Sequence, residues 1–166
     1  MVPERSAILL EVSTSLGSVA FGANGLEGFV GAVVRGNEID LTVAPTCHLE
    51  VQVHQLTSGN AAYDGELQRH IDARRFPAAY VDLHWVRQAD VHAPSYLVGG
   101  ELTFRGVSQP VEGLVVVDLS EPGAMVVRGE QLLDIRVFDV PPPTLFMIKI
   151  EPDVTLSLQL EARLRG

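Results

Sequence analysis

Apolar and polar residues alternate with a period of two along most of this chain, most clearly over residues 96–119. Such alternation is typical of β-strands with one dry face and one wetted face. Residues 105–110 are expected to form a turn, since Gly106 tolerates positive φ and Pro110 ends the loop. The segment therefore predicts a long antiparallel hairpin. Its dry face is expected to carry Val98, Gly100, Leu102 and Phe104 on the first arm and Val111, Gly113, Val115, Val117 and Leu119 on the second.

The same pattern predicts further strands on both sides of this hairpin. They are expected over residues 11–24 (interrupted at Gly17), 29–35, 38–43, 48–56, 79–86, 125–128, 132–138 and 154–163. The pair Gly36-Asn37 suits a tight hairpin turn, and Gly129 is expected to separate two arms. The prolines at 141–143 cannot donate ladder hydrogen bonds, so they are expected to form a connection.

One short helix is expected over residues 64–72. Asp64 suits the N-cap, and Leu67 and Ile71 are spaced to share one face. About eight strands and one helix predict an all-β fold, an eight-stranded antiparallel barrel occupying residues 1–166 as a single domain. A two-sheet sandwich is the alternative, since it also buries one face of every strand. Closure is favoured because long strands with open edges invite aggregation.

The charge balance argues against two classes of partner. The 166 residues include 12 Lys and Arg against 21 Asp and Glu, a net charge of −9. This balance repels nucleic acid and anionic lipid surfaces, so neither nucleic-acid binding nor stable membrane insertion is expected. Cys47 is the single cysteine, and no signal peptide or membrane span is visible. The expected location is cytoplasmic.

Catalytic, cofactor and metal sites have little support in the sequence. The histidines at 48, 54, 70, 84 and 92 lack metal-ligand spacing, although His84 could meet His48 or His54 across strands in a weak surface site. Tyr80, Asp82 and His84 share a face, but it is the wetted one. No glycine-rich phosphate loop leads from a strand into a helix. We therefore expect no enzyme activity, no cofactor and no metal.

An eight-stranded barrel is either filled by side chains or just wide enough for one small ligand. The inward positions here are aliphatic, which would exclude polar guests and accept a hydrocarbon chain at roughly 0.8 kcal/mol per buried methylene. Composition alone favours a filled core with no cavity.

Residues 100–111, GELTFRGVSQPV, favour a hollow lumen over a filled core, because they resemble the central signature of the YceI-like family. Asp64, Leu67, Phe76 and Pro77 also match its helix and the segment that follows, and the likeness runs from about residue 49 to 163. The resemblance implies a lipocalin-like barrel with a helix near one end. It also implies binding of a polyisoprenoid or related amphiphile in the lumen, without catalysis. Residues 11–18, EVSTSLGS, depart from the family's usual first strand. The resemblance therefore does not fix the identity of the ligand.

The hypothesis is thus a noncatalytic carrier or sequestering protein for an isoprenoid or other lipid-like molecule. The residues expected to line the lumen are Val51, Val53, Val81, Leu83, Trp85, Val98, Leu102, Phe104, Val115, Val117, Ile135, Leu156 and Leu158. Arg69, Arg74 and Arg75 could receive an anionic head group, although a solvated face is the favoured reading for them. The alternative function is a filled barrel that acts as a structural or protein-interaction module, for instance as a homodimer. An enzyme on lipid-like substrates would need a polar pair inside the lumen.

Overall fold

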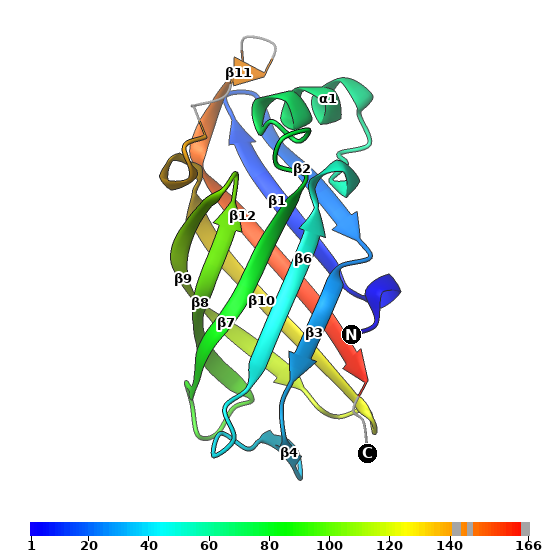
Figure 1. The fold of residues 1–166 in the computed structure, drawn as a ribbon, viewed down its shortest axis with the longest axis vertical. Coiled ribbons are helices and arrows are strands. Elements are labelled where there is room, and N and C mark those ends of the chain that lie inside the picture. Colours follow the sequence, from blue (N-terminus) through cyan, green and yellow to red (C-terminus); the bar gives the residue numbers. More distant parts are fainter. Residues whose placement is uncertain (141–143, 146–147, 164–166) are drawn as a thin grey trace.

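The computed structural model describes residues 1–140, 144–145 and 148–163 and is dominated by antiparallel strands (Figure 1). The strands are β1 (Ala7–Thr14), β2 (Gly17–Asn24), β3 (Glu27–Gly31), β4 (Val34–Arg35), β5 (Glu38–Ile39), β6 (Thr46–Gln52), β7 (Ala78–Gln88), β8 (Ser95–Phe104), β9 (Val107–Asp118), β10 (Ala124–Asp134), β11 (Thr144–Leu145) and β12 (Ile148–Arg163). The helices are α1 (Ala61–His70) and the 3-10 turns η1 (Pro3–Arg5), η2 (Val53–Gln55) and η3 (Ile135–Phe138). The prolines at 141–143, expected to form a connection, lie outside the described residues.

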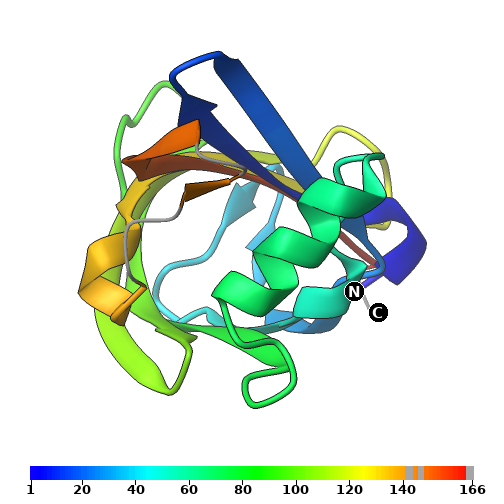
Figure 2. The same cartoon turned by 90° about the horizontal axis from the view of Figure 1, so that it is seen from above.

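The main sheet curls into a barrel whose two edge strands are consecutive in the chain. Its order is β2-β1-β12-β10-β9-β8-β7-β6-β3, and residues 25–26 link β2 to β3. Counting β2 and β3 as one bent strand, the wall has eight strands, which confirms the predicted all-β, lipocalin-like barrel class. On the edge of β2 that faces away from β1, Gly22 and Thr57 exchange two backbone hydrogen bonds of 2.9 and 3.0 Å. Seen from above, the strands form a ring and α1 lies across it (Figure 2).

The predicted central hairpin is present as β8 and β9, but its turn is shorter than expected. Phe104 pairs with Val107, so only Arg105 and Gly106 connect the strands, with φ values of 51° and 72°. Two consecutive left-handed residues match the twist of the flanking strands and make a tight turn. Residues 107–110 therefore belong to β9. Pro110 lies opposite Glu101, in a part of β9 that has no second strand partner because β10 joins only at residues 114–118.

Several predicted boundaries are wrong because single glycines were given too much weight. Gly129 does not separate two arms: β10 runs continuously past it, and Gly129 pairs with Val115 on β9 and Leu158 on β12. Residues 7–24 form the hairpin β1–β2, with the turn at residues 15–16, instead of one interrupted strand. At Gly129, neighbouring strands complete the ladder on both sides and offset the weak strand propensity of glycine.

Two other segments depart from the expected limits. The predicted strand at 48–56 ends at Gln52 and continues as the 3-10 turn η2. The predicted arms at 29–35 and 38–43 supply β3 and the two-residue strands β4 and β5. The expected turn at Gly36-Asn37 is present between these short strands, since Val34 pairs with Ile39.

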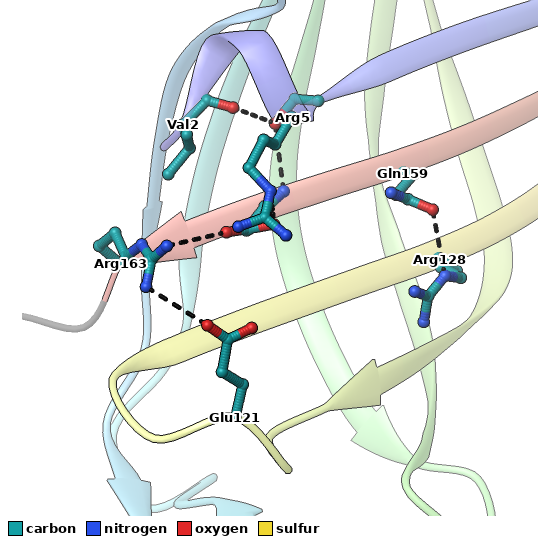
Figure 3. Close-up of polar contacts among 8 residues, drawn as sticks. Val2, Arg5, Glu121, Arg128, Gln159 and Arg163 are labelled. Atoms are coloured by element: carbon teal, nitrogen blue, oxygen red, sulfur yellow. Dashed lines mark hydrogen bonds and ion pairs between the residues drawn. The ribbon is translucent and has the colours of Figure 1, made fainter.

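The N-terminal segment is fastened to the last strand by buried polar groups (Figure 3). Ser6 is fully buried, and its hydroxyl donates to the Val2 carbonyl at 2.9 Å and accepts from the Glu161 backbone N–H at 3.1 Å. The Val2 N–H donates to the Glu161 carbonyl at 2.7 Å, and Arg5 Nε lies 2.8 Å from Glu161 Oε2. These contacts fasten η1 to β12.

Candidate functional site

An apolar cavity of about 160 Å³ lies inside the barrel beneath α1. Among the described residues, its lining side chains are apolar except for His70. Strands β1, β2, β6, β7, β8, β10 and β12 supply the walls, and η2, α1 and η3 also contribute. The cavity exists because inward side chains from strands far apart in sequence converge on one space and do not fill it.

Most of the predicted lumen residues do face inward, but they divide into two groups. Those that line the cavity are Val51, Val53, Val81, Leu102, Phe104, Ile135 and Leu156. Val98, Val115 and Val117 instead pack in a solid cluster with Tyr96 and Met125. Leu158 packs against the core beside the cavity without lining it, and Leu83 lies half-buried opposite Gly100.

Trp85 corrects the prediction, because the structure places it on the outside of the wall. Leu83 pairs with Gly100 and Trp85 with the adjacent Gly99, so His84 is one extra residue in β7. This β-bulge reverses the alternation that follows it. The indole of Trp85 covers Gly99 so closely that it leaves no room for a Cβ there, and the Arg87 guanidinium carbon lies 4.7 Å from the indole centroid.

The end of the barrel away from α1 is filled by the solid cluster. The Ile39 N–H donates to the Tyr96 hydroxyl at 3.3 Å, and Ile39 and Leu41 pack onto the cluster from the β4–β5 segment. Figure 1 shows β4 and α1 at opposite ends of the molecule. The lumen therefore holds packed side chains at one end and a cavity at the other. The sequence left a filled and a hollow barrel as alternatives, and each describes one end of this barrel.

Helix α1 forms the roof of the cavity through one face. Leu67, His70 and Ile71 all contact the cavity, at spacings that place them on the same side of the helix. The helix begins earlier than predicted, because Asn60 is the N-cap and its side chain accepts hydrogen bonds from the backbone N–H groups of Ala62 and Tyr63 at 3.0 and 3.3 Å.

Asp64, predicted as the N-cap, instead ties the first turn of α1 to the preceding loop. Its carboxylate accepts from the Ser58 N–H and hydroxyl at 2.7 and 2.6 Å and from the Thr57 hydroxyl at 2.7 Å. Partial desolvation raises the Asp64 pKa, but these hydrogen bonds outweigh it and leave the pKa below its usual value of 3.8. Because Thr57 is also bonded to Gly22, the roof is linked to β2.

Ionisable groups gather outside the barrel more than inside it. His48 Nδ1 lies 2.6 Å from Asp82 Oδ1, and the His48 ring neighbours those of Phe29 and Tyr80 at 6.1 and 6.0 Å. These side chains come from β3, β6 and β7 and contribute nothing to the cavity lining. Within the described residues, no group of three or more His, Cys, Asp or Glu side chains is arranged to hold a metal ion.

Sequence reasoning missed part of the cavity. Ile8, Leu10 and Val12 on β1 line it, although residues 7–10 had not been assigned to a strand. Their period-two spacing was a usable signal. His70 was also missed, and its place three residues after Leu67 could have assigned it to the same helix face. Phe138 and Val140 carried no such signal, since η3 and the residues after it have no regular period.

Fold and cavity together define a small antiparallel barrel with an apolar cavity beneath its helix. A YceI-like domain model matches residues 5–162, and the chain belongs to this family. The predicted family is thereby confirmed. A search of curated proteins found no significant match.

Solved structures share the fold at low sequence identity. Burkholderia cenocepacia BcnA aligns with a TM-score of 0.79 and 16% identity, over 95% of this chain and 96% of that one. A polyisoprenoid binding domain from Saccharophagus degradans, implicated in plant cell wall breakdown, aligns with a TM-score of 0.76 and 13% identity, over 99% and 97%. Campylobacter jejuni YCEI protein aligns at 0.63 and 14%, over 85% of each chain. Among the described helices of this chain, none is long and apolar enough to cross a membrane.

Proposed function

We propose that this chain is a noncatalytic binding protein that holds the apolar end of a lipid-like amphiphile, such as an isoprenoid, in the cavity beneath α1. Its role would be to carry or sequester that molecule. The observation that supports this most directly is the cavity inside the barrel with its almost wholly apolar lining. A structural neighbour named as a polyisoprenoid binding domain has the same fold, which agrees with the proposal.

The size of the cavity limits how much of a ligand it can enclose. An apolar cavity of about 150 Å³ is known to bind benzene, so 160 Å³ has room for about six carbon atoms. Each methylene transferred from water would contribute roughly 0.8 kcal/mol. A longer chain would extend past α1 or displace it, and only its end would lie in the closed cavity.

The proposal of a noncatalytic role is supported by the chemistry of the lining. General acid-base catalysis uses groups with shifted pKa values held in a shielded site. Of the described residues around the cavity, His70 alone is ionisable. The carboxylate–histidine pair of Asp82 and His48 is on the outer wall, away from the proposed ligand.

A matched pair of substitutions tests where the ligand binds. Val81→Phe fills the cavity from β7, whereas Val116→Phe makes the same change at an outward position on β9 that is 45% exposed. We expect Val81→Phe to weaken binding of farnesol by at least about tenfold, since overpacking leaves no room for the guest. Val116→Phe should bind like the wild type. Fluorescence displacement of a hydrophobic dye measures both, and native mass spectrometry of the purified protein shows whether a guest is retained.

A folded Val81→Phe protein that binds farnesol as tightly as the wild type would overturn the proposed site. The second candidate, a filled barrel that acts as an interaction module, is favoured by the solid cluster around Tyr96 and Met125. It predicts that neither variant nor wild type binds farnesol. The homodimer it allows stays a prediction, which analytical ultracentrifugation would test.

A further inference from the structure

Two arginine side chains lie over one aromatic ring near the roof of the barrel. The guanidinium carbon of Arg75 is 5.2 Å from the centre of the Phe76 ring, and that of Arg105 is 5.9 Å from it. Arg75 belongs to the segment that follows α1, and Arg105 to the turn between β8 and β9. Phe76 also packs against this turn, since a Cβ at Gly106 would lie 3.1 Å from its ring.

These two cations lack the carboxylate partners that Arg69 and Arg136 have. Arg69 pairs with Glu66 and Arg136 pairs with Asp134, but neither Arg75 nor Arg105 forms an ion pair within the described part of the chain. Arg105 Nη1 donates to the neutral Asp139 carbonyl, and its buried Nε has no hydrogen-bond acceptor among the described residues. Two uncompensated cations on one ring are notable in a chain of net charge −9.

The pair is adjacent to the rim of the cavity. Phe104, which lines the cavity, directly precedes Arg105. Phe138 and Val140 also line it, and they flank the Asp139 carbonyl that Arg105 contacts. Ile71, another lining residue, begins the turn that leads to Arg75. Both guanidinium groups are therefore carried by segments that adjoin the lining of the cavity.

We propose that Arg75 and Arg105 bind the anionic head group, a carboxylate or a phosphate, of an amphiphile whose apolar end occupies the cavity. This inference rests on the proposed lipid-binding function and adds the charge of the ligand to it. Guanidinium groups hold such oxyanions through charge-assisted hydrogen bonds, and Phe76 sets the position of both cations. A bound anion would also compensate a partly desolvated charge that now has no counter-ion.

The test compares two probes that share an eight-carbon chain and differ in charge, octanoate and 1-octanol. Isothermal titration calorimetry of the full chain should show octanoate binding at least about tenfold more tightly than 1-octanol at low salt, with the difference shrinking as salt is added. Arg75→Gln and Arg105→Gln should each remove most of this preference without changing the affinity for 1-octanol. Arg87→Gln is the matched control, because Arg87 also lies over an aromatic ring but on the outer wall.

Each alternative result has a distinct meaning. Equal affinity for the two probes, or an octanoate preference that both Gln variants keep, would overturn the head-group site and leave the cavity proposal standing. Failure of either probe to bind would overturn both proposals. Inorganic phosphate is the third probe: if it binds to the wild type as tightly as octanoate does, and depends on the same arginines, the site serves free anions and the lipid assignment is wrong. Arg75 lies in an exposed segment, so its variant remains informative if Arg105→Gln folds poorly.

Discussion

His84 shows how one inserted residue can reverse the orientation of its neighbours in a barrel wall. Before it, Val81 faces the cavity as the period-two pattern predicts; after it, Trp85 faces solvent and Val86 packs on the inner cluster opposite Val98. The pattern in β7 is locally indistinguishable from regular alternation. The close fit of Trp85 over Gly99 stabilises the bulged register, and that contact joins two strands.

A prediction at the residue scale concerns the pKa of the Cys47 thiol. Burial, with a further contribution from the Asp82 charge, raises the pKa of its thiol from 9.0 to about 11. The folded protein therefore favours the neutral thiol. The stabilisation that this preference contributes is fully present below pH 9 and is lost as the pH rises through 11. We expect the free energy of unfolding to fall by on the order of 2 kcal/mol across that window from this residue alone.

Urea unfolding of wild type and Cys47→Ala at pH 8 and pH 11 isolates the effect from other groups that titrate in alkali. The wild type should lose more stability than the variant between the two values. Equal losses would show that the thiol is not desolvated in the folded state.

At the scale of elements, α1 is anchored to the barrel through its first turn. Asp64 connects it to the Thr57–Ser58 loop, and that loop connects to β2. We expect Asp64→Ala to lower the free energy of unfolding by about 1 kcal/mol through the lost hydrogen bonds. Amide hydrogen exchange within α1 should accelerate more than exchange in β8 and β9, since the roof would open locally.

The control for this prediction is Glu66→Ala on the same helix. Glu66 pairs with Arg69 near the surface, and such pairs contribute roughly 0–1 kcal/mol. If both variants speed exchange in α1 to the same extent, the helix is not anchored through Asp64. Since the Asp64 pKa is lowered in the folded protein, its contribution should also fade as pH falls below 3.8, and Asp64→Ala should lack that loss.

At the scale of the whole molecule, buried contacts join the N-terminal segment to the last strand. Ser6 joins Val2 to Glu161 across 155 positions of sequence. Ser6→Ala would leave the buried Glu161 N–H without its acceptor, which costs about 1–3 kcal/mol. We expect thermal unfolding to report a loss in this range. Ser157→Ala, at an exposed hydroxyl 3.5 Å from Glu130, should change stability little.

An equal effect of the two serine substitutions would mean that the buried contacts around Ser6 do not fasten the barrel. This contact could not be predicted from the sequence, because a serine near the N-terminus gives no local sign of its partner near the C-terminus. Most of the strands and the family signature were predictable, since alternation and the motif at residues 100–111 are properties of short segments.

What the sequence determined by itself is therefore local: most of the period-two strands, the pairing of β8 and β9 as a hairpin, the apolar character of the inner face and the family that the chain belongs to. The tertiary structure alone decided which apolar positions surround a cavity and which form the solid cluster around Tyr96. It also decided that Trp85 faces outward and that Arg75 and Arg105 share the ring of Phe76. The physical reason is that alternation assigns a side chain to a face, whereas the space left between faces depends on volumes and registers contributed by distant strands.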